Sequence, residues 1–346
     1  MSSPSDTFAP VPSTHSPAGA ARHAGLTRLS PRQRRLTTIA FWGNLVAQIG
    51  IIITGAIVRL SKSGLGCSTW PNCEPGQFTP RYHPDLGIRP FIEFGNRTLT
   101  GVLLIFAIAV LITSLLWLKH KGRGFLLLAT VPIILTLVQA IVGMAVVVLE
   151  LDPSWVSIHF LISPILVFVS TVLTYRLYNG DDAVRPATAG AVRALFWPLG
   201  ITGYVVLILG TVVTGSGPHS GDANTTSRYA INPRDAAWLH ADVVMLFIGL
   251  LMGLLVALYA SGAHRPAKRA TTALVVLTVL QAIVGYSQYI LEIPELLVGL
   301  HMTGAALFSG GLAWVGASLY TWNAAGTPLR AEAELEEPDV TAQSTH

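Results

Sequence analysis

The sequence predicts an all-α integral membrane protein, with eight transmembrane helices arranged as two parallel-repeated four-helix bundles. Its composition, eight long apolar runs and an internal repeat support this prediction. Of the 346 residues, 51% are apolar and 12% are charged, and the mean hydropathy is +0.56. A soluble domain carries about 25% charged residues, so the composition favours a lipid bilayer as solvent. The basic residues lie mostly between the apolar runs, which argues against nucleic-acid binding.

Eight runs are long and apolar enough to cross a bilayer. A helix needs about 20 residues to span roughly 30 Å of hydrocarbon. Backbone groups in lipid must satisfy their hydrogen bonds internally, which favours helices. The expected spans are residues 37–59, 94–118, 125–149, 155–178, 194–214, 236–260, 270–291 and 295–320.

Polar stretches divide the chain. Residues 1–36 are rich in Pro and Ser and predict a disordered cytoplasmic arm. The apolar run that follows is too long for a cleavable signal peptide. Residues 179–193 predict a cytoplasmic linker, and residues 321–346 predict a second disordered tail. The N-terminal half is then 37–178, and the C-terminal half is 194–320.

Lys and Arg in short loops mark the cytoplasmic side. The links after the second, fourth and sixth spans hold such residues: Lys119, Lys121, Arg123, Arg176, Arg185, Arg193, Arg265, Lys268 and Arg269. We therefore expect a multi-pass protein of the cell (plasma) membrane with both termini in the cytoplasm. The loop 60–92 is expected outside, although it carries cations, which predicts that they have a local anionic partner: Arg59, Lys62, Arg81 and Arg89.

The motif Gln-Ala-Ile-Val-Gly occurs twice, starting at Gln139 and at Gln281. In each copy a glutamate follows eleven residues after the Gln, and a histidine follows twenty residues after it. The matched residues are Glu150 and Glu292, then His159 and His301. This agreement predicts two similar halves related by a pseudo-two-fold axis along the membrane normal. The two glutamines are expected to make interhelical hydrogen bonds.

Counting back from the glutamines matches His240 in the second half with Asn96 in the first. Four polar side chains then gather near the outer face: Asn96, His159, His240 and His301. Polar groups inside a span indicate function, although each His can also simply bond a neighbouring helix. Zinc sites want three or four ligands, whereas two imidazoles from facing helices suit a planar haem. Gly304, one turn beyond His301, is expected to give a porphyrin room.

The two halves differ in ligands. His240 and His301 predict a closed, six-coordinate haem iron, which suits electron transfer. The first half offers His159 and Asn96, and Asn is a poor iron ligand, so iron there would keep an open position for chemistry. The alternative for Asn96 is an interhelical hydrogen bond, worth about 0.6 kcal/mol.

Glu93 lies three residues before Asn96 and shares its helix face. A carboxylate beside an open iron can accept a proton or stabilise a cation. The alternative is an ion pair between Glu93 and Arg97, four residues apart at a helix end. Both roles remain open at this point.

Cys67 and Cys73 are the only cysteines, and both lie in the first outer loop. An oxidising compartment favours a disulfide, which would contribute about 2 kcal/mol by the chain-entropy model. The alternative is a redox-active or substrate-contacting pair. Several arginines are candidates to pair with porphyrin carboxylates: Arg59, Arg81, Arg89, Arg97, Arg228 and Arg234.

Five segments resemble motifs of the haem A synthase family of bacteria and mitochondria. They are Gly64-Leu-Gly-Cys-Ser-Thr-Trp-Pro-Asn-Cys73, Glu93-Phe-Gly-Asn-Arg97, Ser157-Ile-His-Phe160, Val213-Thr-Gly-Ser-Gly-Pro-His219 and Leu300-His-Met302. The resemblance covers about residues 40 to 320. One departure is Asn96, where the family usually has His in a Glu-x-x-His-Arg pattern.

The resemblance implies oxidation of the C8 methyl of haem O to a formyl group, which supplies haem A for cytochrome c oxidase. It implies a resident haem b on His240 and His301, with His159 as the metal ligand in the substrate half. The implied catalytic set is Glu93, Asn96, Arg97 and His159. Expected partners are haem O, haem O synthase, a quinone or other electron acceptor, the bilayer and a second copy of the chain, with no nucleic acid.

Two other functions compete with this one. A bis-His b-type cytochrome would share His240 and His301 and act only in electron transfer with quinone. It leaves the cysteine loop and Glu93 without a role. A transporter is the third possibility, because repeats are common there. The sequence shows no span broken at mid-membrane, which argues against it.

Overall fold

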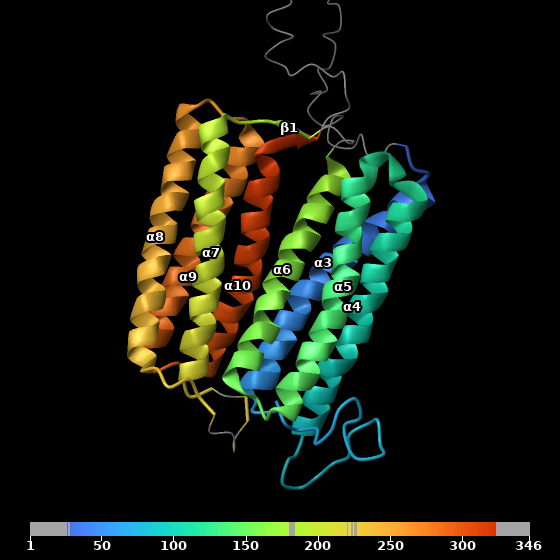
Figure 1. The fold of residues 1–346 in the computed structure, drawn as a ribbon, viewed down its shortest axis with the longest axis vertical. Helices are drawn as coiled ribbons and strands as arrows, with labels where there is room; N and C mark the ends of the chain where they lie inside the picture. The colour runs from blue at the N-terminus through green and yellow to red at the C-terminus, as the bar shows by residue number, and fades with distance from the viewer. Residues whose placement is uncertain are drawn as a thin grey trace, which may run out of the picture.

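The computed structural model of the chain describes residues 26, 28–179, 184–219, 221–222, 224 and 227–322. Most of the arm and the tail beyond Trp322 lie outside this range. Eight long helices make up the described part (Figure 1). They are α3 (Pro31–Leu60), α4 (Arg89–Trp117), α5 (Gly122–Val148), α6 (Pro153–Tyr178), α7 (Gly190–Ser216), α8 (Pro233–Ala260), α9 (Arg265–Ile290) and α10 (Glu295–Ser318).

All eight helices are long and apolar enough to cross a membrane, which confirms the predicted all-α architecture with eight spans. A short 3-10 helix, η1 (Lys119–Lys121), joins α4 to α5. Helix α3 begins earlier than expected, inside the stretch 1–36 predicted as a disordered arm. The Ser30 side chain accepts from the Gln33 N–H while the Gln33 side chain accepts from the Ser30 N–H, and this capping box starts the helix before the apolar run begins.

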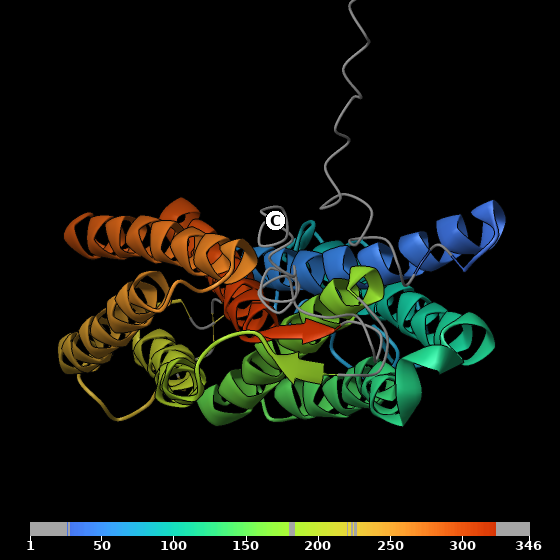
Figure 2. The same cartoon turned by 90° about the horizontal axis from the view of Figure 1, so that it is seen from above.

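Helices α3–α6 lie on one side of the molecule and α7–α10 on the other (Figures 1 and 2). Helices α10 and α6 pack against each other, and α10 also packs on α3. Buried residues of these three helices form a cluster between the sides, made of Leu45, Ile52, Val167 and Ala306. The Ser309 hydroxyl on α10 also donates to the carbonyl of Pro164 on α6, at 2.6 Å.

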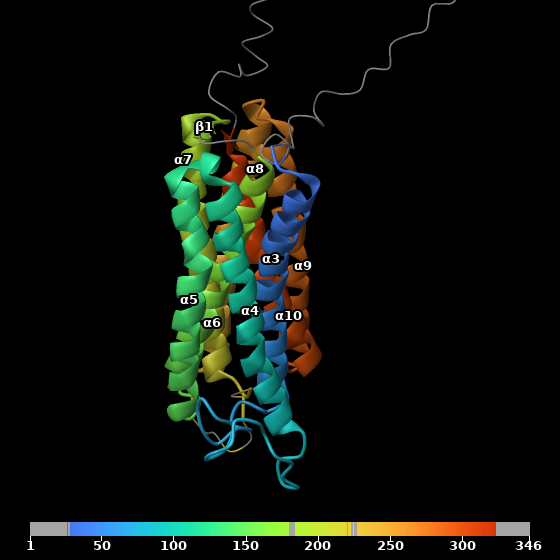
Figure 3. The same cartoon turned by 90° about the vertical axis from the view of Figure 1, so that its right-hand side faces the viewer.

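The linker and tail hold a small sheet that the sequence did not predict. Strand β1 (Val184–Pro186) pairs antiparallel with β2 (Tyr320–Trp322), and Arg185 lies opposite Thr321. The strands lie at the end of the bundle opposite the long loop 61–88 (Figure 1). We call the end with residues 61–88 the loop end and the opposite end the basic end. Figure 3 shows the 61–88 loop below the ends of α3 and α4.

The two short links of the repeat have the same backbone conformation. Glu150 and Leu151 have φ of 50° and 62°, and Glu292 and Ile293 have φ of 59° and 62°. In both links the second residue's N–H donates to the carbonyl five positions earlier, at 2.9 Å for Leu151 and 2.7 Å for Ile293. This local match agrees with a duplication. The pseudo-two-fold relation of the whole halves stays a prediction.

Candidate functional site

The two histidines of the repeat pack in the same way on a glycine of the preceding helix. A Cβ on Gly143 of α5 would lie 3.2 Å from Cε1 of His159 on α6. A Cβ on Gly285 of α9 would lie 3.3 Å from Cε1 of His301 on α10. Both glycines end the Gln-Ala-Ile-Val-Gly motif. The motif therefore supplies the space into which each imidazole ring packs.

His240 packs similarly, and its counterpart Asn96 does not. A Cβ on Gly210 of α7 would lie 3.5 Å from Cε1 of His240 on α8. On α4, the Asn96 amide oxygen accepts a hydrogen bond from the Thr54 hydroxyl of α3, at 2.7 Å. A Cβ on Gly50, which lies four residues before Thr54 as Gly210 lies four residues before Thr214, would meet no atom within 4 Å. Asn96 thus makes the interhelical hydrogen bond that was its alternative role.

The three imidazoles share one feature, which His264 at the basic end also has. Nδ1 of His159, His240 and His301 is fully buried and has no hydrogen-bond partner among the described residues. Each residue as a whole is only half-buried. A buried polar atom without a partner costs about 1–3 kcal/mol, and in native proteins such atoms often mark a functional site or a bound group. These residues fit a role as ligands.

In the second half, the two histidines come from helices on either side of α9. Helices α8 and α10 each pack against α9. Within the described ranges, no group of three or more His, Cys, Asp or Glu side chains is placed to hold a metal ion. A haem iron needs only one or two axial ligands from the protein.

Both repeat glutamines make the predicted interhelical hydrogen bonds. Gln139 Nε2 donates to the Ser163 hydroxyl at 2.7 Å, and Gln281 Nε2 donates to the His301 carbonyl at 3.0 Å. The expectation that Gly304 leaves room for a porphyrin is wrong. A Cβ there would lie 1.9 Å from Oε1 of Gln281, so the space above Gly304 already holds that side chain.

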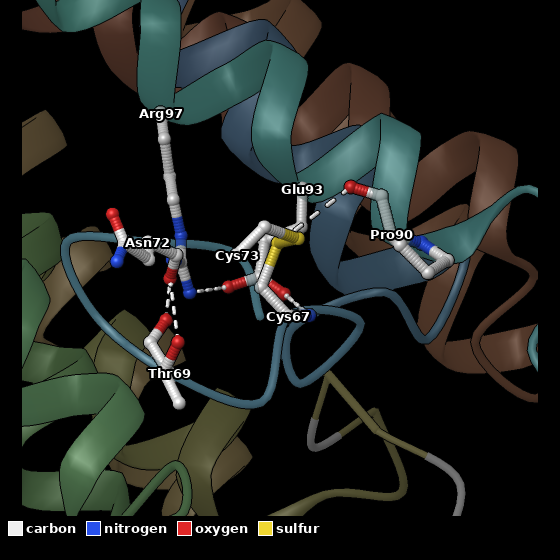
Figure 4. A network of polar contacts seen from close by, with 7 residues as sticks. All are labelled: Cys67, Thr69, Asn72, Cys73, Pro90, Glu93 and Arg97. Carbon is white, nitrogen blue, oxygen red and sulfur yellow. Dashed lines mark hydrogen bonds and ion pairs between the residues drawn. A yellow bond between two sulfur atoms is a disulfide. The ribbon is translucent and has the colours of Figure 1, made fainter. Parts of the chain in front are cut away.

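Glu93 on α4 ties the cysteine loop to the helix end (Figure 4). Its side chain is only 6% exposed. One carboxylate oxygen accepts from the Cys67 N–H at 2.7 Å, and the other pairs closely with Arg97. Arg97 in turn donates to the carbonyls of Thr69 at 2.8 Å and Asn72 at 3.4 Å. The predicted i, i+4 ion pair is present, and it extends into a network that holds the loop.

Cys67 and Cys73 form the predicted disulfide within this loop. The neighbouring backbone approaches α4 very closely, because a Cβ on Gly66 would lie 2.7 Å from the Arg89 carbonyl carbon. Only glycine fits there. The disulfide, Glu93 and Gly66 therefore fix the loop against the start of α4, next to Asn96.

A second set of hydrogen bonds, at more exposed residues, lies in the same loop. Glu74 accepts from His83 Nε2 and from the Arg81 backbone N–H, each at 2.9 Å. The hydrogen bond from His83, followed by that from Arg81, lowers the pKa of the Glu74 carboxyl below its usual value.

Arg59 joins the two loops at the loop end. Its guanidinium donates to the His219 carbonyl at 2.7 Å and to the Thr214 carbonyl at 3.0 Å. The Gly64 N–H donates to the Gly221 carbonyl at 2.8 Å beside it. Among the described residues Arg59 pairs with no carboxylate, and backbone carbonyls accept from its Nε and one of its terminal nitrogens instead. Carbonyls that lie far away in sequence leave no signal in the pattern of charges.

Comparison with known proteins adds an independent finding. Residues 38–221 match the family model described as cytochrome oxidase assembly protein. A protein of Listeria monocytogenes named haem A synthase is 28% identical over 173 residues, which are 49% of this chain and 55% of the Listeria protein. One of Staphylococcus saprophyticus with the same name is 26% identical over 276 residues, covering 75% and 88% of the two chains. The match to the Listeria protein thus spans just over half of its length.

Proposed function

We propose that this chain makes haem A, because it belongs to the COX15-CtaA family of cytochrome oxidase assembly proteins. Its relatives from Listeria and Staphylococcus are named haem A synthase. The observation that carries the proposal is the set of three imidazoles, each packed on a glycine and each with an unpartnered buried Nδ1. These residues offer ligand positions in both halves of one membrane protein.

The proposed reaction oxidises the C8 methyl of haem O to a formyl group by two successive hydroxylations. Written with water as the oxygen source, one water is consumed, and four protons and four electrons leave the substrate. A quinone or another acceptor must take the electrons. A bound haem b in the second half would supply one-electron transfer toward that acceptor.

The first half is the proposed substrate side. His159 would hold the substrate, and no second imidazole stands at position 96, where Asn96 bonds Thr54 instead. Glu93 is the carboxylate nearest in sequence to this position, and it would accept a proton as the methyl group is oxidised. Arg97 fixes the Glu93 side chain and the Cys67–Cys73 loop in one network. His240 and His301 would hold haem b.

The competing function is a bis-His cytochrome that transfers electrons without converting a haem. Such a protein needs His240 and His301 alone. It gives no role to His159, which packs on its glycine as His301 does, or to the buried Glu93–Arg97 pair. The additional imidazole of His159 and the buried Glu93–Arg97 pair favour the synthase.

Haem extraction separates the two functions. We expect membranes that contain haem O to gain haem A when this chain is produced, as seen by chromatography of the extracted pigments. Glu93→Ala and His159→Ala should stop the conversion and keep haem b bound. His264→Ala, a histidine change at the basic end, serves as the control and should convert normally. Full conversion by both site variants would refute the assignment, and no haem A with the unaltered chain would favour the cytochrome.

A further inference from the structure

Within the described ranges, carboxylates gather at one end of the bundle, whereas cations such as Arg59, Arg97 and Lys119 occur at both ends. Over the described part of the chain, every carboxylate lies in a loop at the loop end or in the half of a helix nearest that end: Glu74, Asp85, Glu93, Glu150, Asp152, Asp222, Asp235, Asp242, Glu292 and Glu295. The basic end carries cations from every helix pair, including Arg34, Arg123, Arg193 and Arg269. The described residues of this end therefore present a positive surface.

One hollow at the basic end concentrates this charge. Arg265, Lys268 and Arg269 line it together with Tyr259 and Thr272. The three cations fall at i, i+3 and i+4 of α9 and so share one face, where like charges repel. The Lys268 ammonium also lies 4.8 Å from the centre of the Tyr259 ring. A ligand for this hollow must be an anion.

The helix surface below the hollow identifies the class of anion. Exposed apolar side chains continue from Arg269 along α9 at three- or four-residue steps, beyond Thr272: Val276, Val279, Leu280 and Ile283. Each of these four is more than half exposed. A free phosphate has no apolar part that could contact this stripe. A phospholipid places its phosphate against the cations and its acyl chain along the apolar side chains.

The start of α3 repeats the pattern. Arg34 and Arg35 line a second hollow with Ile39. Trp42 and Val46, which are 46% and 62% exposed, follow Ile39 at the same helical steps. Basic residues at a membrane surface attract anionic lipids, and an arginine fork matches phosphate oxygens.

We propose that the hollow formed by Arg265, Lys268 and Arg269 binds the headgroup phosphate of an anionic phospholipid. The acyl chain lies along the apolar stripe of α9. The lipid supplies the counter-charge that the described residues of this end do not provide. This inference is independent of the haem chemistry at the loop end.

Lipid retention by the purified full-length protein tests the proposal. Native mass spectrometry after exchange into detergent would count bound phosphatidylglycerol, with phosphatidylcholine and inorganic phosphate as comparison ligands. Each cation is worth about fivefold in binding. We therefore expect Arg265→Gln/Arg269→Gln to weaken phosphatidylglycerol binding about 25-fold. Lys119→Gln/Arg123→Gln removes the same charge from the same end outside the hollow and should bind normally.

Two results would overturn the proposal. Equal losses in the two double variants would show a diffuse charge effect without a site. Displacement of phosphatidylglycerol by millimolar inorganic phosphate would show a site for a free anion. Arg265→Lys/Arg269→Lys changes the same two side chains but keeps their charge, so the proposal predicts that it retains most of the binding, and a loss equal to that of the double Gln variant would contradict it. Size-exclusion profiles check folding without relying on haem.

Discussion

Replacing Gly285 by alanine places a methyl group against the ring of His301. The new Cβ would lie 3.3 Å from Cε1, closer than the 3.4–4 Å of ordinary van der Waals contact. The ring or the helix must therefore shift by a few tenths of an ångström. Gly143→Ala makes the same change for His159, at 3.2 Å. Gly55→Ala is the matched control, because nothing lies within 4 Å of its Cβ.

The size of the expected change in haem b binding follows from two opposing effects on free energy. Overpacking a tight site costs about 1–3 kcal/mol, whereas Gly→Ala inside a helix is favourable by about 0.5–1 kcal/mol. If the overpacking cost falls on the bound haem, Gly285→Ala weakens haem b binding by about 5- to 150-fold. Gly55→Ala should only gain, by up to about 1 kcal/mol of unfolding free energy.

The assay is the haem b content per chain, with the reduced-minus-oxidised absorption spectrum, for the three variants purified in parallel. We expect Gly285→Ala to lose haem b, Gly143→Ala to keep haem b but convert less haem O, and Gly55→Ala to match the unaltered chain. Equal haem content and conversion in all three would refute the role given to the glycines.

Three further predictions concern the loop end. Glu93→Gln removes one partner of a buried ion pair, so it should destabilise the protein by about 3–5 kcal/mol. Because Glu93 also holds the loop, the change should speed reduction of the disulfide by thiols. An unchanged melting temperature and an unchanged reduction rate would contradict this. Arg59→Met removes the Arg59 donors from the His219 carbonyl and from the Thr214 carbonyl, which keeps the Gly217 N–H, and should cost about 1–3 kcal/mol in unfolding free energy. The same change at an exposed arginine is the control, and an equal effect at both sites would contradict the role of Arg59 in joining the two loops. Because the folded-state pKa of Glu74 is lowered, its stabilising effect is present above its usual pKa and is lost as the pH falls through the lower folded value. Protease cleavage of the loop should therefore rise at acidic pH in the unaltered chain, whereas Glu74→Gln should show the open loop at every pH, and identical pH profiles would exclude this role.

The hydropathy pattern determined the fold closely because lipid allows few alternatives. All eight expected spans lie within or almost within the observed helices. The predictions fail where capping or tertiary contacts determine the bounds of an element. Helix α3 starts at Ser30 through its capping box. Strands β1 and β2 pair across the chain, and a three-residue strand has too short a pattern to recognise.

The candidate site divides in the same way. Spacing alone matched His159 with His301, and the structure gives both rings the same glycine contact. The role of Arg59 was missed because its partners are carbonyls, which every residue has. Gly304 was misjudged because only the structure shows the Gln281 side chain over it. The type and spacing of residues predict candidate site residues, whereas contacts between segments far apart in sequence are seen only in the structure.

The central claim is that one haem b is held by His240 and His301 together. Electron paramagnetic resonance of the purified oxidised protein tests it most directly, for the unaltered chain beside His240→Ala, His301→Ala and His159→Ala. We predict a low-spin bis-imidazole haem signal that each second-half variant abolishes and that His159→Ala retains. A haem signal that survives both second-half substitutions, or a purified protein with no haem at all, would contradict the account.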